Sequence, residues 1–346
     1  MQTPAPSTAT LQKIVLLSTG GTIAGRATHA QDNVNYQAGQ LNANELLVHV
    51  PALNGLGIET HSIAQIDSKD MDAGTWHALV AAVVHHSQRE DVAGIVITHG
   101  TDTLEETAYL LYRVLPPGKP VALTAAMRPA TSLQSDGPQN LMDAVHWIKY
   151  AAQQPHLAGG GVVVAMASQI WSGAEVRKIH PYRLDPLSAG DAGPVGWVRE
   201  GQIQWLRALP VSDLSTIFIH QKLLQLPPQQ WPRVVLVDSH GGMDTVWLEQ
   251  WGDLVMTAQV QGVIAVGTGN GTLHHHLQTV LTSLTEQGIA VRVCTRCITG
   301  SLVPGQALSG GLLPFLPRLS PAQARIELML DLISRGKYQS APSQYG

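Results

Sequence analysis

The sequence predicts an α/β protein with two parts: a larger N-terminal domain built on a doubly wound, mainly parallel sheet, and a smaller C-terminal α/β domain. Short β-branched apolar runs such as residues 94–98 alternate with helical patterns such as residues 75–87. Several of these runs end in corners rich in glycine and hydroxyl groups. The length of 346 residues also exceeds the usual size of one compact core, which favours two domains.

The elements follow from this alternation in chain order. Strands of the N-terminal domain are predicted at residues 13–17, 58–66, 94–98, 120–126 and 161–167. Helices are predicted at residues 41–49, 75–87, 107–115 and 140–152. Strands of the C-terminal domain are predicted near residues 234–237, 263–266 and 289–293. The polar stretch 26–41 is long for a connection in an α/β unit, and loops of that length are typical of lids.

Changes in composition along the chain suggest where the domains end. We expect a disordered tail at residues 1–10, the N-terminal catalytic domain at 11–209, a proline-rich linker at 210–232 and the C-terminal domain at 233–346. The first ten residues have no apolar core of the kind a signal peptide needs, and no apolar run reaches the length of a membrane span. The sequence therefore predicts a cytoplasmic protein without a membrane partner.

Composition also argues against several classes of partner and cofactor. The net charge of −4, without a dense basic run, disfavours nucleic acid. Cys294 and Cys297 lie in an apolar run and lack the further ligands of a zinc site, so we expect buried structural thiols. Residues 274–276 are three consecutive histidines, and neighbours on a helix do not face one point, which favours an exposed helix start. No metal or other cofactor is expected.

The most informative corner follows the strand at residues 94–98. Thr101 and Asp102 come directly after His99 and Gly100, before a helical pattern begins. Ligands bind at the carboxyl ends of the strands in an open parallel sheet, so these two side chains are placed for chemistry. Thr103 and Glu106 have the spacing of a capping box, which gives that pair a structural explanation.

Three further motifs accompany this corner. The first strand runs into T-G-G-T-I-A-G, in which Gly21 lets the backbone approach a small ligand and Thr22 supplies a hydroxyl. D-S-K-D-M stands at residues 67–71, and A-A-M-R-P-A-T-S-L-Q-S-D-G-P stands at residues 125–138. In order and spacing these motifs resemble those of the bacterial-type L-asparaginases, over roughly residue 13 to the end of the chain. The resemblance implies L-asparagine as substrate and a threonine acyl-enzyme.

Hydrolysis of a carboxamide needs an acyl acceptor and a way to deprotonate it. The chain has no Gly-x-Ser-x-Gly motif and no cysteine with an evident base, which leaves threonine, and a lysine can act as the base when burial and neighbouring charges lower its pKa. The resemblance implies two catalytic groups: Thr22 with Tyr36, and Thr101 with Lys178 and Asp102. We assign Thr22 as the nucleophile, and the opposite assignment of the two threonines remains open.

The resemblance also implies how the amino acid is recognised. Ser68 would donate to the α-carboxylate, and Asp102 would pair with the α-ammonium. Two departures concern this part of the site. Lys69 stands where the family commonly has an uncharged residue, and residues 287–325 contain no Asp or Glu, although many relatives supply a glutamate there from a neighbouring subunit. Thr272, in a glycine-rich loop, falls where relatives reach into a partner's site, which implies a homotetramer built as a dimer of dimers.

Four other functions compete with this interpretation. A glutaminase-asparaginase or another amidohydrolase of small amino acids would use the same residues, and a non-catalytic amino-acid-binding relative would explain the missing glutamate. A dinucleotide-binding enzyme would need G-x-G-x-x-G, whereas the first corner has G-G-x-x-x-G. An amidotransferase subunit acting on charged transfer RNA would carry an additional N-terminal domain. Thr22, Tyr36, Thr101, Asp102 and Lys178 together favour an amidohydrolase.

Overall fold

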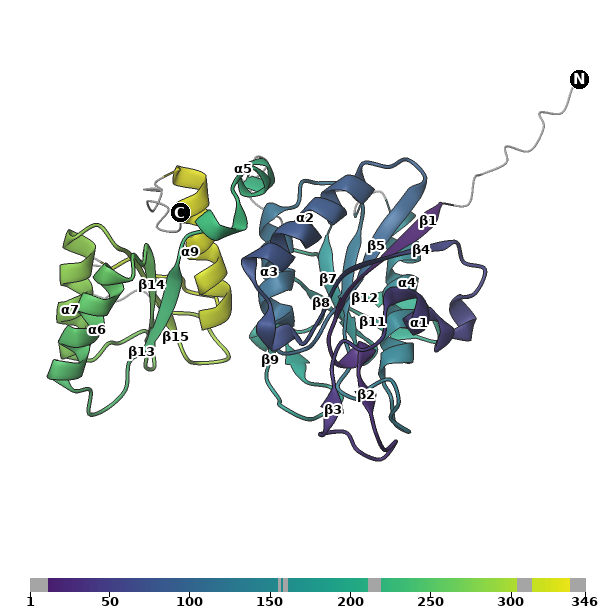
Figure 1. Ribbon diagram of the computed structural model, residues 1–346, viewed down its shortest axis with the longest axis horizontal. Helices are drawn as coiled ribbons and strands as arrows, with labels where there is room; N and C mark the ends of the chain where they lie inside the picture. The colour runs from purple at the N-terminus through teal and green to yellow at the C-terminus, as the bar shows by residue number, and fades with distance from the viewer. Residues whose placement is uncertain (1–11, 155–156, 158–160, 211–218, 304–312, 337–346) are drawn as a thin grey trace, which may run out of the picture.

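A computed structural model describes residues 12–154, 157, 161–210, 219–303 and 313–336. It has an eight-stranded sheet of order β12-β11-β8-β7-β6-β5-β1-β4 and, in the C-terminal part, a three-stranded sheet of order β13-β14-β15 (Figure 1). The two-domain α/β architecture predicted from the sequence is confirmed. The predicted tail at residues 1–10 and part of the predicted linker, residues 211–218, lie outside the described residues.

The strands of the large sheet are β1 (Lys13–Gly20), β4 (Ile58–Ile66), β5 (Val92–Thr98), β6 (Val121–Thr124), β7 (Val162–Met166), β8 (Gln169–Ser172), β11 (Gly196–Arg199) and β12 (Gln202–Trp205). Two-residue strands form two short hairpins, β2 (Arg26–Ala27) with β3 (Tyr36–Gln37) and β9 (Arg177–Lys178) with β10 (Leu187–Ser188). The small sheet contains β13 (Val234–Asp238), β14 (Gly262–Gly267) and β15 (Ala290–Thr295). The helices are α1 (Ala43–Val48), α2 (Ala73–Ser87), α3 (Leu104–Val114), α4 (Gly137–Ala152), α5 (Ile219–Gln225), α6 (Thr245–Thr257), α7 (His275–Glu286) and α9 (Pro321–Arg335).

Helices cover both faces of the large sheet. Side chains alternate along β1, so Val15 and Leu17 pack in the core shared with α2 and α3, whereas Ile14 and Leu16 pack in the core shared with α4. Figure 1 shows α2 and α3 on one side of the sheet and α1 and α4 on the other. Because strands β4, β1, β5, β6 and β7 are parallel, their carboxyl ends meet at one edge.

Three strands at the other end of the sheet were not predicted. β8, β11 and β12 are antiparallel to their neighbours. The turn from β7 to β8 has Ala167 and Ser168 at φ of 54° and 57°, and neither is a glycine or asparagine of the kind that usually marks such a turn. The hairpin was therefore not visible in the sequence.

Two smaller expectations need correction. Thr103 makes no capping bond; its hydroxyl donates to the carbonyl of Ser68 at 2.7 Å, and Glu106 pairs with Arg325 instead. Cys294 is buried as expected, and burial raises the pKa of its thiol to about 12, but Cys297 is exposed. Within the predicted linker, residues 219–225 form α5, which packs against α2 and α9.

Helix α9 joins the two domains. It packs on the small sheet and on α3 of the larger domain, and Figure 1 shows it between the two sheets. Arg113 of α3 donates to Glu327 of α9 at 2.7 and 3.0 Å, and Tyr109 donates to the same carboxylate at 2.9 Å.

In the described residues no helix combines the length and apolar character needed to cross a membrane.

Candidate active site

Three polar corners meet at the carboxyl ends of β1, β4 and β5. Gly21, with φ of 78°, lies so close to Gly100 that an added Cβ would be 2.3 Å from the Gly100 nitrogen. A Cβ on Gly100 would in turn be 2.5 Å from Oγ of Ser68. Only glycine allows both contacts, so the two glycines let the corners carrying Thr22, Thr101 and Ser68 pack against one another.

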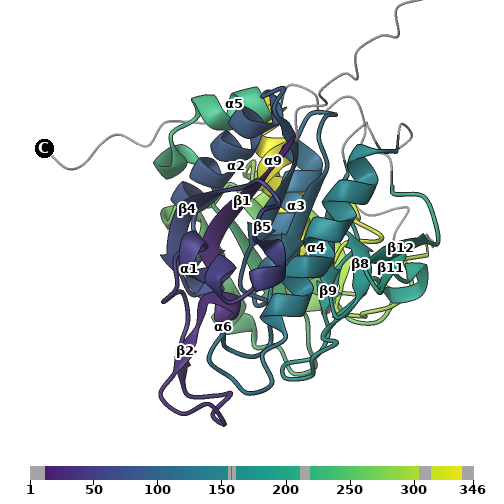
Figure 2. The same cartoon turned by 90° about the vertical axis from the view of Figure 1, so that its right-hand side faces the viewer.

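The first hydroxyl of the site belongs to Thr22, in the turn that follows β1. The Thr22 side chain is 8% exposed, and its Oγ1 lies 2.7 Å from the phenolic oxygen of Tyr36. Tyr36 comes from the β2–β3 hairpin, which extends beyond the end of the large sheet (Figure 2). Burial raises the pKa of the Tyr36 phenol, so it is a neutral hydroxyl near pH 7 that can donate or accept.

The second hydroxyl belongs to Thr101 and has an amine as its partner. Nζ of Lys178 donates to Oγ1 of Thr101 at 2.9 Å and to Oδ1 of Asp102 at 2.5 Å. Thr101 is 4% exposed, and the Lys178 side chain is 18% exposed, whereas that of Asp102 is 53% exposed. The amine is therefore shielded from solvent between the two groups, and the carboxylate keeps an open side.

Ser68 and Lys69 stand next to each other but have different surroundings. Ser68 is buried, and its Oγ accepts a hydrogen bond from the backbone N–H of Asp102 at 3.3 Å. Lys69 is mostly exposed, with Nζ 2.7 Å from a carboxylate oxygen of Asp67 and 3.2 Å from one of Asp70. Hydrogen bonding to these two carboxylates raises the pKa of Lys69, which keeps it a paired cation.

The group formed by Thr22 and Tyr36 is influenced electrostatically by the charges around Thr101 and Ser68. The charges of Asp67 and Asp102 raise the pKa of the Tyr36 phenol, in addition to the larger effect of burial, and the charge of Lys69 lowers it. Thr22 with Tyr36 and Thr101 with Lys178 therefore share one local environment. Such a set can supply a hydroxyl nucleophile, a neutral proton relay and an amine.

Thr272 does not join this set within one chain. It lies on the exposed loop after β14, where its hydrogen bonds among the described residues go to Thr268, including a 2.9 Å bond between the two hydroxyls. None of these hydrogen bonds links Thr272 to Thr22, Ser68 or Thr101.

One site residue was missed from the sequence. Oε2 of Glu105 accepts the backbone N–H of Lys178 at 2.7 Å, and its Oε1 accepts the hydroxyl of Ser320 at 3.1 Å. These partners are 73 and 215 positions away, so no local pattern could have identified them.

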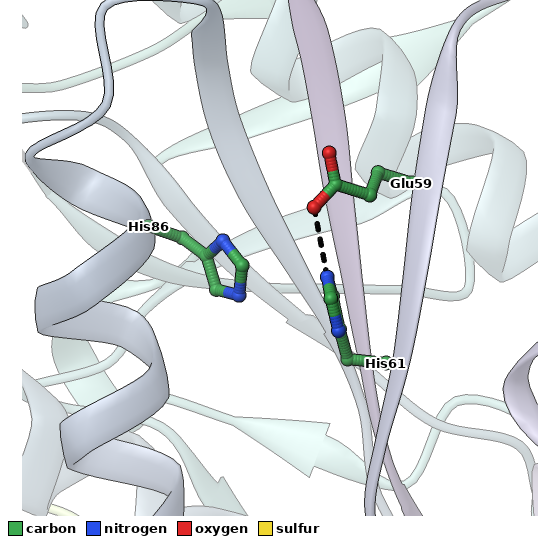
Figure 3. Close-up of side chains that lie close together, drawn as sticks. All are labelled: Glu59, His61 and His86. Atoms are coloured by element: carbon green, nitrogen blue, oxygen red, sulfur yellow. Dashed lines mark hydrogen bonds and ion pairs between the residues drawn. The ribbon is translucent and has the colours of Figure 1, made fainter.

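Among the described side chains, one group has the composition of a metal site: Glu59, His61 and His86, whose candidate ligand atoms lie within 4.8 Å of one another. Figure 3 shows Nε2 of His61 pointing at the Glu59 carboxylate, at 2.8 Å. The guanidinium of Arg89 also donates to both Glu59 oxygens, at 2.6 and 2.8 Å, and lies 3.0 Å from Nδ1 of His86. A permanent cation thus already occupies these groups, and we assign no metal to them.

A doubly wound domain that presents two hydroxyls, a phenol and an amine at the carboxyl ends of its strands is typical of a hydrolytic enzyme that works through hydroxyl groups. Comparison with known proteins also indicates a hydrolytic enzyme. The family models "Asparaginase, N-terminal" and "Glutaminase/Asparaginase C-terminal domain" match residues 13–211 and 233–341. The chain belongs to the asparaginase family of amidohydrolases.

Individual relatives cover most of the chain. The L-asparaginase 2 of Escherichia coli is 32% identical over 326 residues, which are 93% of this chain and 89% of that protein. The glutaminase-asparaginase of Pseudomonas aeruginosa is 33% identical over 285 residues, 81% of this chain and 74% of that protein. The crystal structure of a probable cytoplasmic L-asparaginase from Campylobacter jejuni matches with a TM-score of 0.82 and 30% identity, covering 93% of this chain and 95% of that one.

Proposed function

We propose that this chain hydrolyses L-asparagine to L-aspartate and ammonia through an acyl-enzyme on Thr22. The observation that carries the proposal is the Lys178 amine, which contacts both the Thr101 hydroxyl and the Asp102 carboxylate. A lysine in contact with a buried threonine hydroxyl can move protons to and from reacting oxygen atoms. The printed names of the relatives, L-asparaginase and glutaminase-asparaginase, support an amide of this size as substrate.

The first half of the reaction forms the ester. Oγ1 of Thr22 attacks the side-chain carbonyl carbon of asparagine, and its proton passes by way of the Tyr36 phenol, 2.7 Å away, to the leaving nitrogen. The C–N bond breaks, ammonia leaves, and an aspartyl ester remains on Thr22. Because its pKa is raised, Tyr36 acts as a neutral relay and not as a phenolate base.

The second half of the reaction uses the other hydroxyl. Thr101 and Lys178 orient a water molecule and accept its proton as its oxygen attacks the ester carbonyl. The ester C–O bond breaks, aspartate forms, and Thr22 regains its proton. Each pair therefore acts in one half of the cycle: Thr22 with Tyr36 in acylation, and Thr101 with Lys178 in deacylation.

Substrate recognition would use the groups at the open side of the site. The Ser68 hydroxyl accepts from Asp102, so its own proton remains to donate to the α-carboxylate. Asp102 can pair with the α-ammonium through its exposed side. Gly21 brings the backbone close to the ligand, and Thr272 of another copy would complete the pocket. Because no acid occurs at residues 287–325, we expect a KM for L-asparagine above that of relatives that keep a glutamate there.

Lys69→Gln is expected to lower the KM for L-asparagine, at most about threefold at low salt, because an exposed charge has a small effect. Removing this cation leaves Asp67 and Asp70 unpaired, and a more negative rim favours an incoming α-ammonium. The decrease should fade as salt is raised. A higher KM in the variant would instead mean that Lys69 binds the α-carboxylate. An unchanged KM at every salt concentration would mean that Lys69 has no part in binding the substrate.

We expect a homotetramer, built as a dimer of dimers. Helix α6 leaves a row of apolar side chains exposed on the C-terminal domain, with Val246 and Leu254 each 61% and Trp247 50% exposed. A second copy that covers this row would remove it from water. Sedimentation should show a tetramer at micromolar concentration, weakened by Trp247→Glu but not by the control Val48→Glu, whose residue is 75% exposed on α1. A fully active monomer would contradict the assembly.

Ammonia release from L-asparagine, L-glutamine, D-asparagine and β-aspartyl amides tests the substrate. We expect the highest kcat/KM for L-asparagine; a higher value for L-glutamine would instead indicate a glutaminase-asparaginase. If none of these amides released ammonia, the chain would be a non-catalytic protein that binds amino acids.

We also propose a cytoplasmic location, supported by the name of the Campylobacter relative, and fractionation of the source cells would test it.

A further inference from the structure

The segment 176–178, which delivers the catalytic lysine, is held by the C-terminal part of the chain. Nε2 of Gln323, a fully buried residue in the first turn of α9, donates to the carbonyl oxygen of Val176 at 3.0 Å. The guanidinium of Arg177 donates to the carbonyl oxygen of Ile298 at 2.8 Å. The two residues before Lys178 are thus held by the C-terminal part of the chain, Val176 through its carbonyl oxygen and Arg177 through its side chain.

The third contact passes through one carboxylate of the N-terminal domain. Glu105 accepts the backbone N–H of Lys178 with one oxygen and the Ser320 hydroxyl with the other. Ser320 is the N-cap of α9, and its Oγ also accepts from the backbone nitrogen of Gln323 at 3.1 Å. The Glu105 carboxylate therefore connects the start of α9 to the residue that carries the reactive amine.

We propose that Glu105 is a positioning residue, through which the N-terminal turn of α9 sets the place of the Lys178 amine. The described hydrogen bonds of the Glu105 side chain do not reach Thr101 or Asp102. Glu105 instead acts on the main chain of Lys178, whose backbone N–H it accepts. The inference rests on the proposed function, because it assigns Lys178 to catalysis. It adds that the C-terminal domain contributes to catalysis within its own chain.

The geometry explains why such a tether matters. Nζ of Lys178 must reach Thr101 and Asp102 at the same time, at 2.9 and 2.5 Å, from the end of a flexible side chain. Its own strand, β9, is only two residues long and, among the described strands, pairs with β10 alone, so it gives the main chain little support. A shift of about 1 Å in a reacting group can lower a rate roughly 100-fold.

Glu105→Ala, Glu105→Gln and Glu106→Ala test the proposal together. Glu106 is the matched control, because it lies in the same turn of α3 and also contacts α9, through Arg325, but in the described part of the chain its side chain makes no hydrogen bond or ion pair with residues 176–178. We expect Glu105→Ala to lower kcat for L-asparagine by roughly 10- to 100-fold with KM changed less than about threefold. Glu106→Ala should keep kcat within about threefold of wild type. In Glu105→Gln the amide oxygen can accept from Lys178 and the amide nitrogen can donate to Ser320, so kcat should recover to within about threefold.

Hydrogen exchange at the backbone amide of Lys178 gives a readout that needs no activity. It should be faster in Glu105→Ala than in wild type, Glu105→Gln and Glu106→Ala. The proposal is overturned if Glu105→Ala keeps the kcat of Glu106→Ala, if Glu105→Gln is as slow as Glu105→Ala, or if exchange at Lys178 does not change. A wild-type enzyme that releases no ammonia would overturn the proposed function instead. The exchange experiment would still show whether Glu105 holds the main chain of Lys178.

Discussion

Thr22→Ala and Thr101→Ala are each expected to lower kcat for L-asparagine by roughly three to five orders of magnitude, because each removes a hydroxyl that reacts or moves a proton. The double variant should be little slower than the slower single variant, since the two hydroxyls act in one reaction cycle. Steady-state ammonia release, measured with enough enzyme to detect slow turnover, checks both statements.

Two neighbouring hydroxyls provide matched controls. Ser18 on β1 and Thr98 on β5 have buried hydroxyls without hydrogen-bond partners among the described residues. Ser18→Ala and Thr98→Val should therefore keep kcat within about threefold of wild type. Near-normal turnover in Thr22→Ala would disprove the assignment of Thr22 as the nucleophile.

Lys178→Met is expected to lower kcat by roughly a thousandfold or more, because it removes the amine between Thr101 and Asp102 but keeps much of the side-chain volume. Lys178→Arg should be nearly as slow, within about tenfold, since arginine keeps the positive charge but cannot give up a proton. The two variants therefore separate proton transfer from simple charge.

Substrate binding provides the control for the lysine variants. L-Aspartate or L-asparagine should still raise the melting temperature of Lys178→Met, because Ser68 and Asp102 remain and a bound ligand stabilises the folded state. If Lys178→Arg turned over asparagine at nearly the wild-type rate, the lysine would be needed only as a cation, and its role in proton transfer would have to be given up.

The polar corners were predictable because each is local in sequence. A β-branched run followed at once by polar residues is a strand that ends at the ligand-binding edge of a parallel sheet, so the corners that carry Thr22, Ser68 and Thr101 could be placed without a structure. In the folded chain the three corners meet because β1 pairs with both β4 and β5.

Other features depended on partners far along the chain. Thr103 was interpreted as a helix cap because Glu106 has the right spacing, yet its hydroxyl bonds Ser68, 35 positions away. Glu105 is partly buried at the start of a helix, where an acidic residue normally faces solvent, and only Lys178 and Ser320 explain its place. Tertiary contacts of this kind override local patterns, so they become visible only in the folded chain.

Identifying the acylated residue tests the central claim most directly. Rapid acid quench of the enzyme with L-asparagine, in the wild type and in Lys178→Met, should trap an aspartyl ester if deacylation depends on Lys178. Trypsin separates the two candidates, because cleavage after Lys13 and Arg26 releases Thr22 on one peptide and cleavage after Arg89 and Arg113 releases Thr101 on another. We predict that mass spectrometry finds one added aspartyl group on Thr22 in residues 14–26. An aspartyl group on Thr101 in residues 90–113 would contradict the account and reverse the roles of the two threonines.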